Sequence, residues 1–399
     1  MANEQRYDAV VVGAGPAGSA AARGIARGGF RVLVLEEHAQ IGVPLHCSGL
    51  VTPRTLVEAG VGEGMIVNAI VGAHVCVPSG RTLTIGNGKT RAYVIDRVGL
   101  DRALADSAQQ AGAALMRGAR LLDARREHGG VTLSIRRNDA LHTLRTRLLI
   151  GADGVHSRVA KALGLSGPSE RVFGLGAEGV LPGSDRDHVQ VFVGNDIAPG
   201  WFAWTIPLGD GRVRLGVGSS GPLRPAAAMR RFLSVYAQRL GGWEQRRLTG
   251  GVIPIWSRRA TVGDNVMLVG DAAGQVKPTS GGGIFSGLAG ARLAAETACD
   301  ALAKDDLSER ALRAYAKAWE KAFGREFRRG EDLRRLYKTL TDEDFERMLR
   351  IFSARPVVAL FNRYGDIDYP GGVFRRLFSA TPALWALARG PLRYGRLWR

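Results

Sequence analysis

The stretch VVGAGPAGSAAARGIARGGFRVLVLEE, residues 11–37, decides the fold of this chain. It contains the pattern G-x-G-x-x-G after YDAVVV, a β-branched run that is typical of a buried parallel strand. An Ala-rich segment with helical spacing follows, and FRVLVLEE then favours a second strand. In such a strand–helix–strand unit, the helix N-terminus binds a pyrophosphate and the acidic strand end binds a ribose hydroxyl. The predicted dinucleotide contacts are Gly13, Gly15, Ala17, Gly18 and Glu36.

The same glycine spacing recurs in GLGAEG, which begins at Gly174, and in GVGSSG, which begins at Gly216. A chain with 54 glycines produces such matches by chance, and neither is followed by a helical segment. We predict that both are glycine-rich strand ends. The chain then has one dinucleotide unit, and a nicotinamide donor would bind only transiently.

The composition is that of an ordinary globular protein, with 45% hydrophobic and 23% charged residues. The sequence has no apolar run of about 18 residues, which a membrane-spanning helix needs. Its first residues lack the features of a secretory signal. Cys47, Cys76 and Cys299 show neither metal-binding nor disulfide spacing. We therefore expect a cytoplasmic chain with reduced thiols and no metal site.

The formal net charge of +18 indicates an affinity for anions. A nucleic-acid partner is not expected, because no recognisable nucleic-acid-binding module is present. An anionic membrane surface and a phosphorylated substrate both remain open. The third alternative is that the net charge reflects only an abundance of arginine and no anionic partner.

Three later stretches carry residue types that suit a nucleotide site. YVIDRVGLDRAL places Asp96 and Arg97 before a helix, and LLIGADGVHSRVAKALG places Asp153 after a buried strand. VGDAAGQVKPTSGGGI places Asp271 after a strand and a glycine cluster before a helix. A carboxylate can accept hydrogen bonds from sugar hydroxyls, and glycines let backbone N–H groups approach a phosphate. Each residue taken alone also fits a surface turn or a helix cap.

Together with the opening motif, this ordered set resembles the FAD enzymes of the para-hydroxybenzoate hydroxylase superfamily over roughly residues 7–300. The resemblance implies tightly bound FAD. The further FAD contacts that it implies are Cys47, Ser48, Arg97, Asp271, Gly283 and Ile284.

Features of the dinucleotide unit return near the middle of the chain and again near residue 270, with strand-rich segments between them. This interleaving predicts an α/β fold, α+β overall, in which a Rossmann-type FAD-binding domain alternates with a mainly antiparallel substrate domain. We assign residues 1–65, 92–165 and 262–304 to the FAD-binding domain, 66–91 and 166–261 to the substrate or catalytic domain, and 305–399 to a helical C-terminal region.

Within the superfamily, the chain is most similar to the geranylgeranyl reductase family. PGWFAWTIP, residues 199–207, resembles the family pattern P-x-x-[YF]-x-W-x-[FY]-P, although Ile206 stands where an aromatic residue is usual. The resemblance implies an aromatic-walled substrate tunnel. The alternative is an amphipathic strand whose aromatic side chains only fill a core. The implied substrate contacts are Pro199, Phe202, Trp204 and Pro207.

GVPLHCSGL places Cys47 shortly after the acidic strand end, where the family has a cysteine in an Arg-Cys-Gly/Ala-Glu-Gly context. Here His46 precedes the cysteine and Ser48 follows it, so the acidic residue is absent. This departure leaves the substrate head group and the route of proton delivery open. An unperturbed thiol, with a pKa of about 8.5, is mostly protonated at neutral pH. We expect Cys47 to donate a proton or to shape the pocket beside the flavin; simple packing is the alternative.

The resemblance therefore implies an FAD-dependent reductase that saturates C=C bonds of a prenyl chain on a lipid, a diphosphate or a quinone. The implied electron donor is NAD(P)H or a ferredoxin-like protein. One alternative is an FAD-dependent monooxygenase acting on an aromatic or alkene substrate, and another is a non-catalytic FAD-containing protein that binds membrane surfaces. The Cys47 loop and the 199–207 stretch favour reduction.

The C-terminal end after Asp368 has no acidic residue and contains six arginines among several aromatic residues. Arginine with interfacial aromatics suits the headgroup region of an anionic bilayer. We predict peripheral association with the inner face of the cell membrane; the alternative is a helix packed on the FAD domain. The residues concerned are Arg375, Arg376, Arg389, Arg393, Arg396 and Arg399, with Phe374, Phe378, Trp385, Tyr394 and Trp398.

Overall fold

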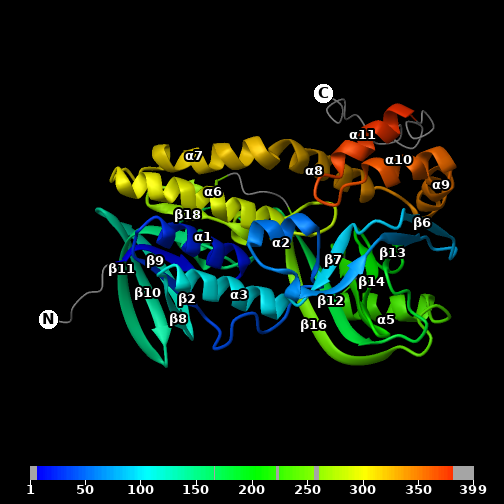
Figure 1. The fold of residues 1–399 in the computed structure, drawn as a ribbon, viewed down its shortest axis with the longest axis horizontal. Coiled ribbons are helices and arrows are strands. Elements are labelled where there is room, and N and C mark those ends of the chain that lie inside the picture. The colour runs from blue at the N-terminus through cyan, green and yellow to red at the C-terminus, as the bar shows by residue number, and fades with distance from the viewer. Residues whose placement is uncertain (1–6, 166, 222–223, 256–259, 381–399) are drawn as a thin grey trace.

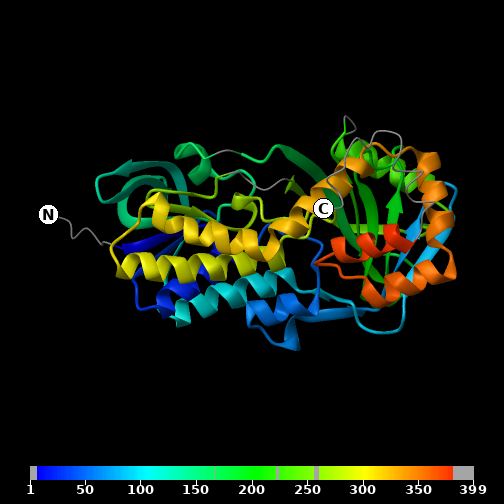
Figure 2. The same cartoon turned by 90° about the horizontal axis from the view of Figure 1, so that it is seen from above.

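The computed structural model describes residues 7–380 apart from 166, 222–223 and 256–259. The chain forms two lobes along its long axis, with the N-terminal strands in one lobe and a large antiparallel sheet in the other (Figure 1). Long helices lie over the first lobe, and the C-terminal helices lie over the second on the same side of the molecule (Figures 1 and 2).

The first lobe is built on a sheet of order β17-β18-β11-β1-β2-β8, in which β1 pairs in parallel with β2 and β11. The β-branched run near the N-terminus forms β1, and Ala9, Val10 and Val11 are completely buried there. β9 and β10 extend β11 as an antiparallel meander. The strands are β1 (Tyr7–Val12), β2 (Val32–Glu36), β8 (Ala114–Arg117), β9 (Ala119–Glu127), β10 (Gly130–Arg137), β11 (Ala140–Gly151), β17 (Val262–Gly263) and β18 (Val266–Leu268).

Helices cover one face of this sheet, and the meander with a short helix covers the other. The helices approach each other through small residues: a Cβ added at Gly24 would lie 2.5 Å from the Ala295 Cβ. A Cβ at Gly28 would likewise lie 2.4 Å from the Cys299 sulfur, so this cysteine packs between helices. The elements are α1 (Pro16–Arg27), α3 (Arg97–Gln110), α4 (Arg158–Ala162), α6 (Ile284–Ala303) and α7 (Glu309–Trp319).

The second lobe contains a seven-stranded sheet of order β16-β12-β15-β14-β13-β5-β6. Its neighbours are antiparallel except for β5 and β13, which pair in parallel. Helix α5 (Pro225–Val235) packs on one face, where Phe192 of the sheet meets Phe232 edge to face. The strands are β5 (Gly72–Cys76), β6 (Thr82–Gly86), β12 (Glu170–Val180), β13 (His188–Val193), β14 (Phe202–Gly209), β15 (Arg212–Ser219) and β16 (Glu244–Ile255).

A small sheet of order β3-β7-β4 connects the two lobes. The predicted domain boundaries separate β4 from β7, although these strands pair with each other. The division into domains therefore stays a prediction. The elements here are β3 (Leu50–Val51), α2 (Pro53–Ala59), the 3₁₀ turn η1 (Glu63–Met65), β4 (Ile66–Ile70) and β7 (Ala92–Ile95).

Beyond α7 the described chain is helical, and the predicted interleaved plan with a helical C-terminal region is confirmed. Among the described helices, none combines the length and apolar character that a membrane crossing requires. The elements are the π-helical turn η3 (Glu320–Gly324), α8 (Arg325–Tyr337), α9 (Asp342–Phe352), α10 (Arg355–Tyr364) and α11 (Gly371–Ala380).

Candidate active site

The three glycines of the opening motif have different structural roles in the turn between β1 and α1. Gly13 has φ +101°, and a Cβ there would lie 2.4 Å from the Ala152 carbonyl oxygen. A Cβ at Gly18 would lie 1.9 Å from the Gly13 oxygen. At Gly15, the residue before α1, a Cβ would meet nothing within 4 Å. The outer glycines therefore permit the turn and its packing, and the middle one leaves the helix N-terminus accessible.

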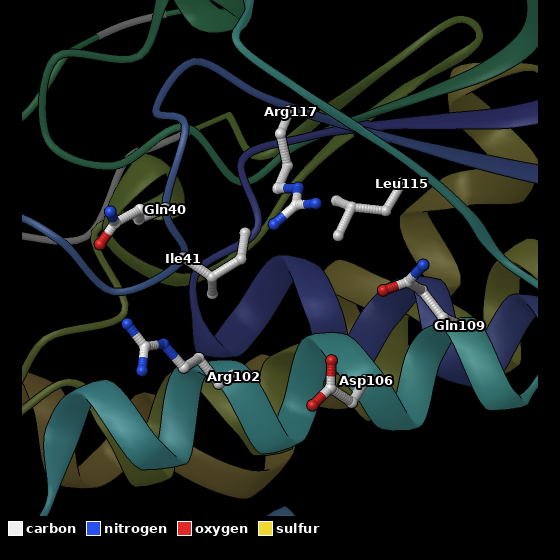
Figure 3. Close-up of a pocket in the computed structure, with 7 residues that line it drawn as sticks. All are labelled: Gln40, Ile41, Arg102, Asp106, Gln109, Leu115 and Arg117. Carbon is white, nitrogen blue, oxygen red and sulfur yellow. The ribbon is translucent and has the colours of Figure 1, made fainter.

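Glu36 ends β2 beside this turn, as the strand–helix–strand unit predicts. One carboxylate oxygen accepts a hydrogen bond from the Ala14 N–H at 2.9 Å, and the other accepts one from the His38 N–H at 2.9 Å. A cavity of 380 Å³ opens nearby, between α3 and β8, where Arg117 is the register partner of Glu36 (Figure 3). Its lining residues are Gln40, Ile41, Arg102, Asp106, Gln109, Leu115 and Arg117.

A second helix N-terminus meets the same turn. Asp271 lies in the 3₁₀ turn η2 (Gly270–Ala273), and α6 begins at Ile284 after Gly283 without a side-chain cap. A Cβ at Gly283 would lie 3.2 Å from a carboxylate oxygen of Asp271. A Cβ at Gly270 would lie 2.8 Å from the Ala17 Cβ of α1. Burial raises the pKa of Asp271 to about 6, and the positive charge of Arg97 opposes that rise.

A buried hydrogen-bond chain fixes the turn that carries Asp271. The Gly270 N–H donates to the Gln275 side-chain oxygen at 2.7 Å, and the Gln275 amide donates to the Tyr315 hydroxyl at 2.7 Å. That hydroxyl donates to the Leu268 carbonyl at 2.8 Å. The sequence analysis missed both side chains, because Tyr315 lies 40 residues from its partner and no local motif marks it.

Arg97 lies where the Cys47 loop meets α3. Its guanidinium pairs with Asp101, one turn further along the helix, and the Nη2–Oδ2 distance is 3.1 Å. Burial lowers the pKa of Arg97, but Asp101 and the Cys47 side chain outweigh this effect and raise it. The buried Nε of Arg97 has no hydrogen-bond partner among the described residues. The structure therefore brings Cys47, Arg97 and Asp271 to one place.

The Cys47 loop is held against the large sheet. The Ser48 carbonyl accepts a hydrogen bond of 2.7 Å from Arg214 of β15, and Arg214 also pairs with Glu178 at 3.2 Å. His46 is hydrogen-bonded through Nδ1 to the Gly250 carbonyl of β16. Sequence reasoning missed Arg214, because it lies 166 residues from Ser48 in the sequence.

The aromatic stretch predicted to bind substrate lies on β14 and on the loop before it. Phe202 and Trp204 share one strand face, with ring centroids 5.9 Å apart. Pro207 is buried near the end of that strand, and a Cβ at Gly221 would lie 3.0 Å from the Pro199 Cβ. Both predicted prolines thus border the aromatic strand.

Trp201, which the pattern did not single out, is the most buried ring of this stretch. Its side chain stacks on Phe202 with centroids 5.0 Å apart, and the residue is 2% exposed. Arg334 of α8 lies over the indole at 4.6 Å and pairs with Glu170 at 2.6 Å. A Cβ at Gly281 would lie 3.2 Å from the Trp201 ring. The aromatic wall therefore extends to the glycine cluster that precedes α6.

Glycines of the large sheet form the surface beneath these rings. A Cβ at Gly216 would lie 2.3 Å from the Trp204 ring, and one at Gly218 would lie 2.1 Å from the Trp201 ring. Gly218 pairs with Gly174, which pairs with Gly251 beneath His46. A Cβ at Gly174 would meet only the Gly251 carbonyl within 4 Å, at 3.7 Å. A strip without side chains therefore lies between His46 and Trp201, and we call it the glycine strip.

Two other acidic residues of the predicted set are structural caps: Asp96 accepts the Gly99 N–H at the beginning of α3, and Asp153 caps α4. The Asp153 carboxylate accepts hydrogen bonds from the Ser157 hydroxyl at 2.6 Å and from the N–H groups of Arg158 and Val159. Burial raises its pKa, and these hydrogen bonds oppose the rise. The contacts hold the beginning of α4 against the end of β11.

The site fits FAD, because two uncapped helix N-termini converge beside the open Gly15 position and the unpartnered Arg97 Nε. A family model described as an FAD binding domain matches residues 6–217, which include the glycine turn, the Cys47 loop and the aromatic stretch. The chain is therefore an FAD-dependent oxidoreductase.

Three known proteins show to which family of FAD-dependent oxidoreductases the chain belongs. Digeranylgeranylglycerophospholipid reductase 1 of Methanococcoides burtonii is 33% identical, over 93% of this chain and 93% of the relative. Digeranylgeranylglycerophospholipid reductase of Methanothrix thermoacetophila is 31% identical, over 96% of this chain and 98% of the relative. A geranylgeranyl bacteriochlorophyll reductase-like structure from Thermoplasma acidophilum has a TM-score of 0.87 and 26% identity, covering 96% of this chain and 100% of that one. The chain belongs to the geranylgeranyl reductase family, an FAD-dependent class that acts on prenyl chains, as the resemblance predicted.

Proposed function

We propose that this reductase saturates geranylgeranyl-type chains on a polar membrane lipid. The prenyl chain of the lipid would lie along the glycine strip. The strip carries this proposal, because a Cβ at Gly174 would meet only backbone within 4 Å, whereas His46 and Trp201 rise on either side. A flat floor between side walls suits a planar alkene. The head group is assigned from the names of the relatives, which are glycerophospholipid reductases.

The residues of this chain divide between cofactor and alkene. FAD would be held by residues from five places in the fold: Gly13, Gly15, Ala17 and Gly18 in the turn and first residues of α1, Glu36 at the end of β2, Ser48 in the Cys47 loop, Arg97 at the start of α3, and Asp271 of η2 with Gly283 and Ile284 at the start of α6. Reduced FAD, when bound, supplies a hydride for one carbon of the double bond. The other carbon needs a proton, and we assign its delivery to the Cys47 side chain, which contacts Arg97.

The aromatic wall would position the prenyl chain and exclude water from it. The Trp204 and Trp201 rings cover Gly216 and Gly218 of β15, so apolar rings line this side of the strip. Alkene reduction needs both reacting carbons within near-attack distance of their donors, and a rigid wall supplies that constraint. Trp201 is held from behind by Arg334, so its ring position depends on α8.

The reaction is tested by incubating the dithionite-reduced holoenzyme with a digeranylgeranyl glycerophospholipid without oxygen, followed by mass spectrometry. We expect the lipid to gain two hydrogen atoms for each double bond that disappears. Geranylgeranyl diphosphate in a parallel reaction tests the head group. Flavin that is reduced but leaves every prenyl substrate unchanged would refute the proposal. Incorporation of labelled oxygen in air would instead support the monooxygenase alternative.

The electron donor is proposed as NAD(P)H or a ferredoxin-like protein. The two later glycine matches lie mainly inside β12 and β15 of the large sheet rather than in a turn between a strand and a helix, which supports transient docking for a nicotinamide. Anaerobic mixing with NADH, NADPH or reduced ferredoxin and observation of flavin bleaching distinguishes the donors.

We also propose a cytoplasmic location, with peripheral binding to the inner face of the cell membrane. The segment 381–399, with most of the predicted basic and aromatic residues, lies outside the described residues. In α11, Arg375 and Arg376 are exposed, whereas Val373 and Leu377 pack against α10. A basic residue near an anionic surface contributes about 1 kcal/mol. Salt-sensitive cosedimentation with phosphatidylglycerol vesicles, lost on truncation after Asp368, is the expected result; no cosedimentation at low salt would contradict it.

A further inference from the structure

Two histidines and an aspartate form a compact cluster on β5, β13 and the loop before β13 in the large sheet, away from the flavin site. His74 lies in β5, and His188 begins β13, its parallel neighbour. Their rings stack with centroids 4.8 Å apart and an interplanar angle of 19°. A Cβ at Gly72 would lie 2.6 Å from the His188 ring, so a larger residue would displace that ring.

The nitrogen and oxygen atoms of the cluster that could bind a metal ion point toward one another. The Nε2 of His74 lies 2.9 Å from a carboxylate oxygen of Asp185, and the Nδ1 of His188 lies 3.7 Å from the other oxygen. One ligand atom from each of the three residues lies within 4.8 Å of the others. Ligand atoms around a tetrahedral Zn²⁺ are about 3.3 Å apart when the metal bonds are about 2.0–2.2 Å. The observed separations bracket this value, so small side-chain rotations bring the atoms to a common centre.

Two surrounding groups already orient the ligands. The Nδ1 of His74 is hydrogen-bonded to the Thr84 hydroxyl at 2.9 Å, which leaves Nε2 to face the carboxylate. The Asp185 carboxylate accepts the Asp187 N–H at 3.1 Å, which fixes its loop. Metal-bound histidines usually carry such a partner on their second nitrogen. Asp187 adds a second carboxylate, 2.6 Å from the Nδ1 of His188.

We propose that His74, His188 and Asp185 bind a divalent transition-metal ion of the Zn²⁺ type, with water completing the coordination. Two imidazoles and one carboxylate form a nitrogen–oxygen set that suits Zn²⁺ better than Mg²⁺ or Ca²⁺. The ion would join β5 to the loop before β13, and it would stabilise the only parallel strand pair in the described part of this sheet.

The site is separate from the reaction. His188 has the same strand parity as Phe192, which packs against α5, whereas Trp204 lies on the opposite sheet face. The ion would therefore have a structural role, and its binding does not depend on the proposed prenyl substrate.

The test uses untagged full-length holoenzyme, stripped with a chelator and titrated with Zn²⁺ in a calorimeter. We expect a single site per chain, and a rise in unfolding temperature when Zn²⁺ is added. His74→Gln and His188→Gln should each weaken binding at least about tenfold, and Thr84→Val should weaken it by about tenfold through the lost orienting contact. Co²⁺ in place of Zn²⁺ should give visible absorption typical of a tetrahedral nitrogen–oxygen site.

The matched control is His142→Gln, which changes an exposed histidine of β11 and should leave Zn²⁺ binding unchanged. Flavin absorbance of every variant reports whether the fold is kept. Wild-type protein that binds Zn²⁺ no more tightly than the His74→Gln/His188→Gln double variant would overturn the proposal. A reductase assay that fails while Zn²⁺ still binds would contradict only the proposed function.

Discussion

The turn at Gly13–Gly18 and the segment Gly216–Gly221, which begins in β15, have the same glycine spacing but use it in opposite ways. In the turn, the middle glycine faces open space at a helix N-terminus. In the strand, rings of Trp204 and Trp201 occupy the space above Gly216 and Gly218. A missing side chain thus admits a ligand in one region and the protein's own side chain in the other. Which use applies depends on where the glycines lie: Gly18 lies inside α1, whereas Gly216 and Gly218 lie inside β15. The prediction that no helix follows the later match is wrong, because α5 begins at Pro225, just after Gly221.

The largest expected effect comes from filling the open position. Gly15→Val should abolish FAD binding, because the new side chain occupies the approach to the helix N-terminus. Flavin absorbance of the purified variant, and its recovery after incubation with FAD, measure the effect. Gly62→Val is the matched control, since Gly62 has a similar extended backbone before a short helix and open space around it. A yellow Gly15→Val protein would show that the turn does not contact the cofactor.

Cys47 lies in the loop that Arg214 holds against β15, and its loss should have the next largest effect. Cys47→Ala should keep FAD but slow alkene saturation by about 10²-fold or more, the usual contribution of a general acid. Single-turnover reoxidation of reduced flavin by a prenyl lipid measures the rate. Cys299→Ala serves as the control, because that cysteine packs between α1 and α6. Equal rates for wild type and Cys47→Ala would return Cys47 to a packing role.

The aromatic rings over the strand glycines predict selectivity for the length of the prenyl substrate. Trp204→Ala should weaken binding of long prenyl substrates more than short ones, by about tenfold, since a long chain contacts more of the wall. Competition between geranyl and geranylgeranyl lipids gives the ratio directly. Equal losses for both lengths would indicate that Trp204 only fills the core.

The smallest effect concerns stability alone. Gly218→Ala should lower the free energy of unfolding by about 1–3 kcal/mol, because the added methyl overlaps the Trp201 ring. Combining it with Trp201→Leu should cost less than the sum of the two changes, and FAD content should not change. Chemical denaturation of the four proteins in the cycle measures this coupling. Strict additivity would mean that the ring and the glycine do not interact.

The sequence predicted those parts of the fold and cofactor site whose signals are local. The β-branched run, the glycine turn and Glu36 all lie within one short stretch, and the structure places them together. The family resemblance and FAD dependence are confirmed by the relatives. The residue roles at Cys47 and in the aromatic stretch stay predictions.

The features that sequence reasoning missed depend on distant pairing. Arg214 reaches the Cys47 loop, and Tyr315 reaches Gln275, through contacts that no spacing rule reveals. His74 and Asp185 lie 111 residues apart and meet only because β5 and β13 are neighbours. Trp201 stood inside the quoted pattern, but its role became visible only once Gly218 was found beneath it.

The contact between Arg334 and Trp201 makes one side of the glycine strip depend on a helix that supplies none of the predicted FAD contacts. Arg334 of α8 lies over the Trp201 ring and is anchored to Glu170. The same helix also packs toward the FAD-binding lobe, because a Cβ at Gly330 would lie 3.1 Å from Pro278. A substitution at Arg334 therefore alters the strip without removing a predicted cofactor contact, whereas one at Gly330 would disturb both lobes at once.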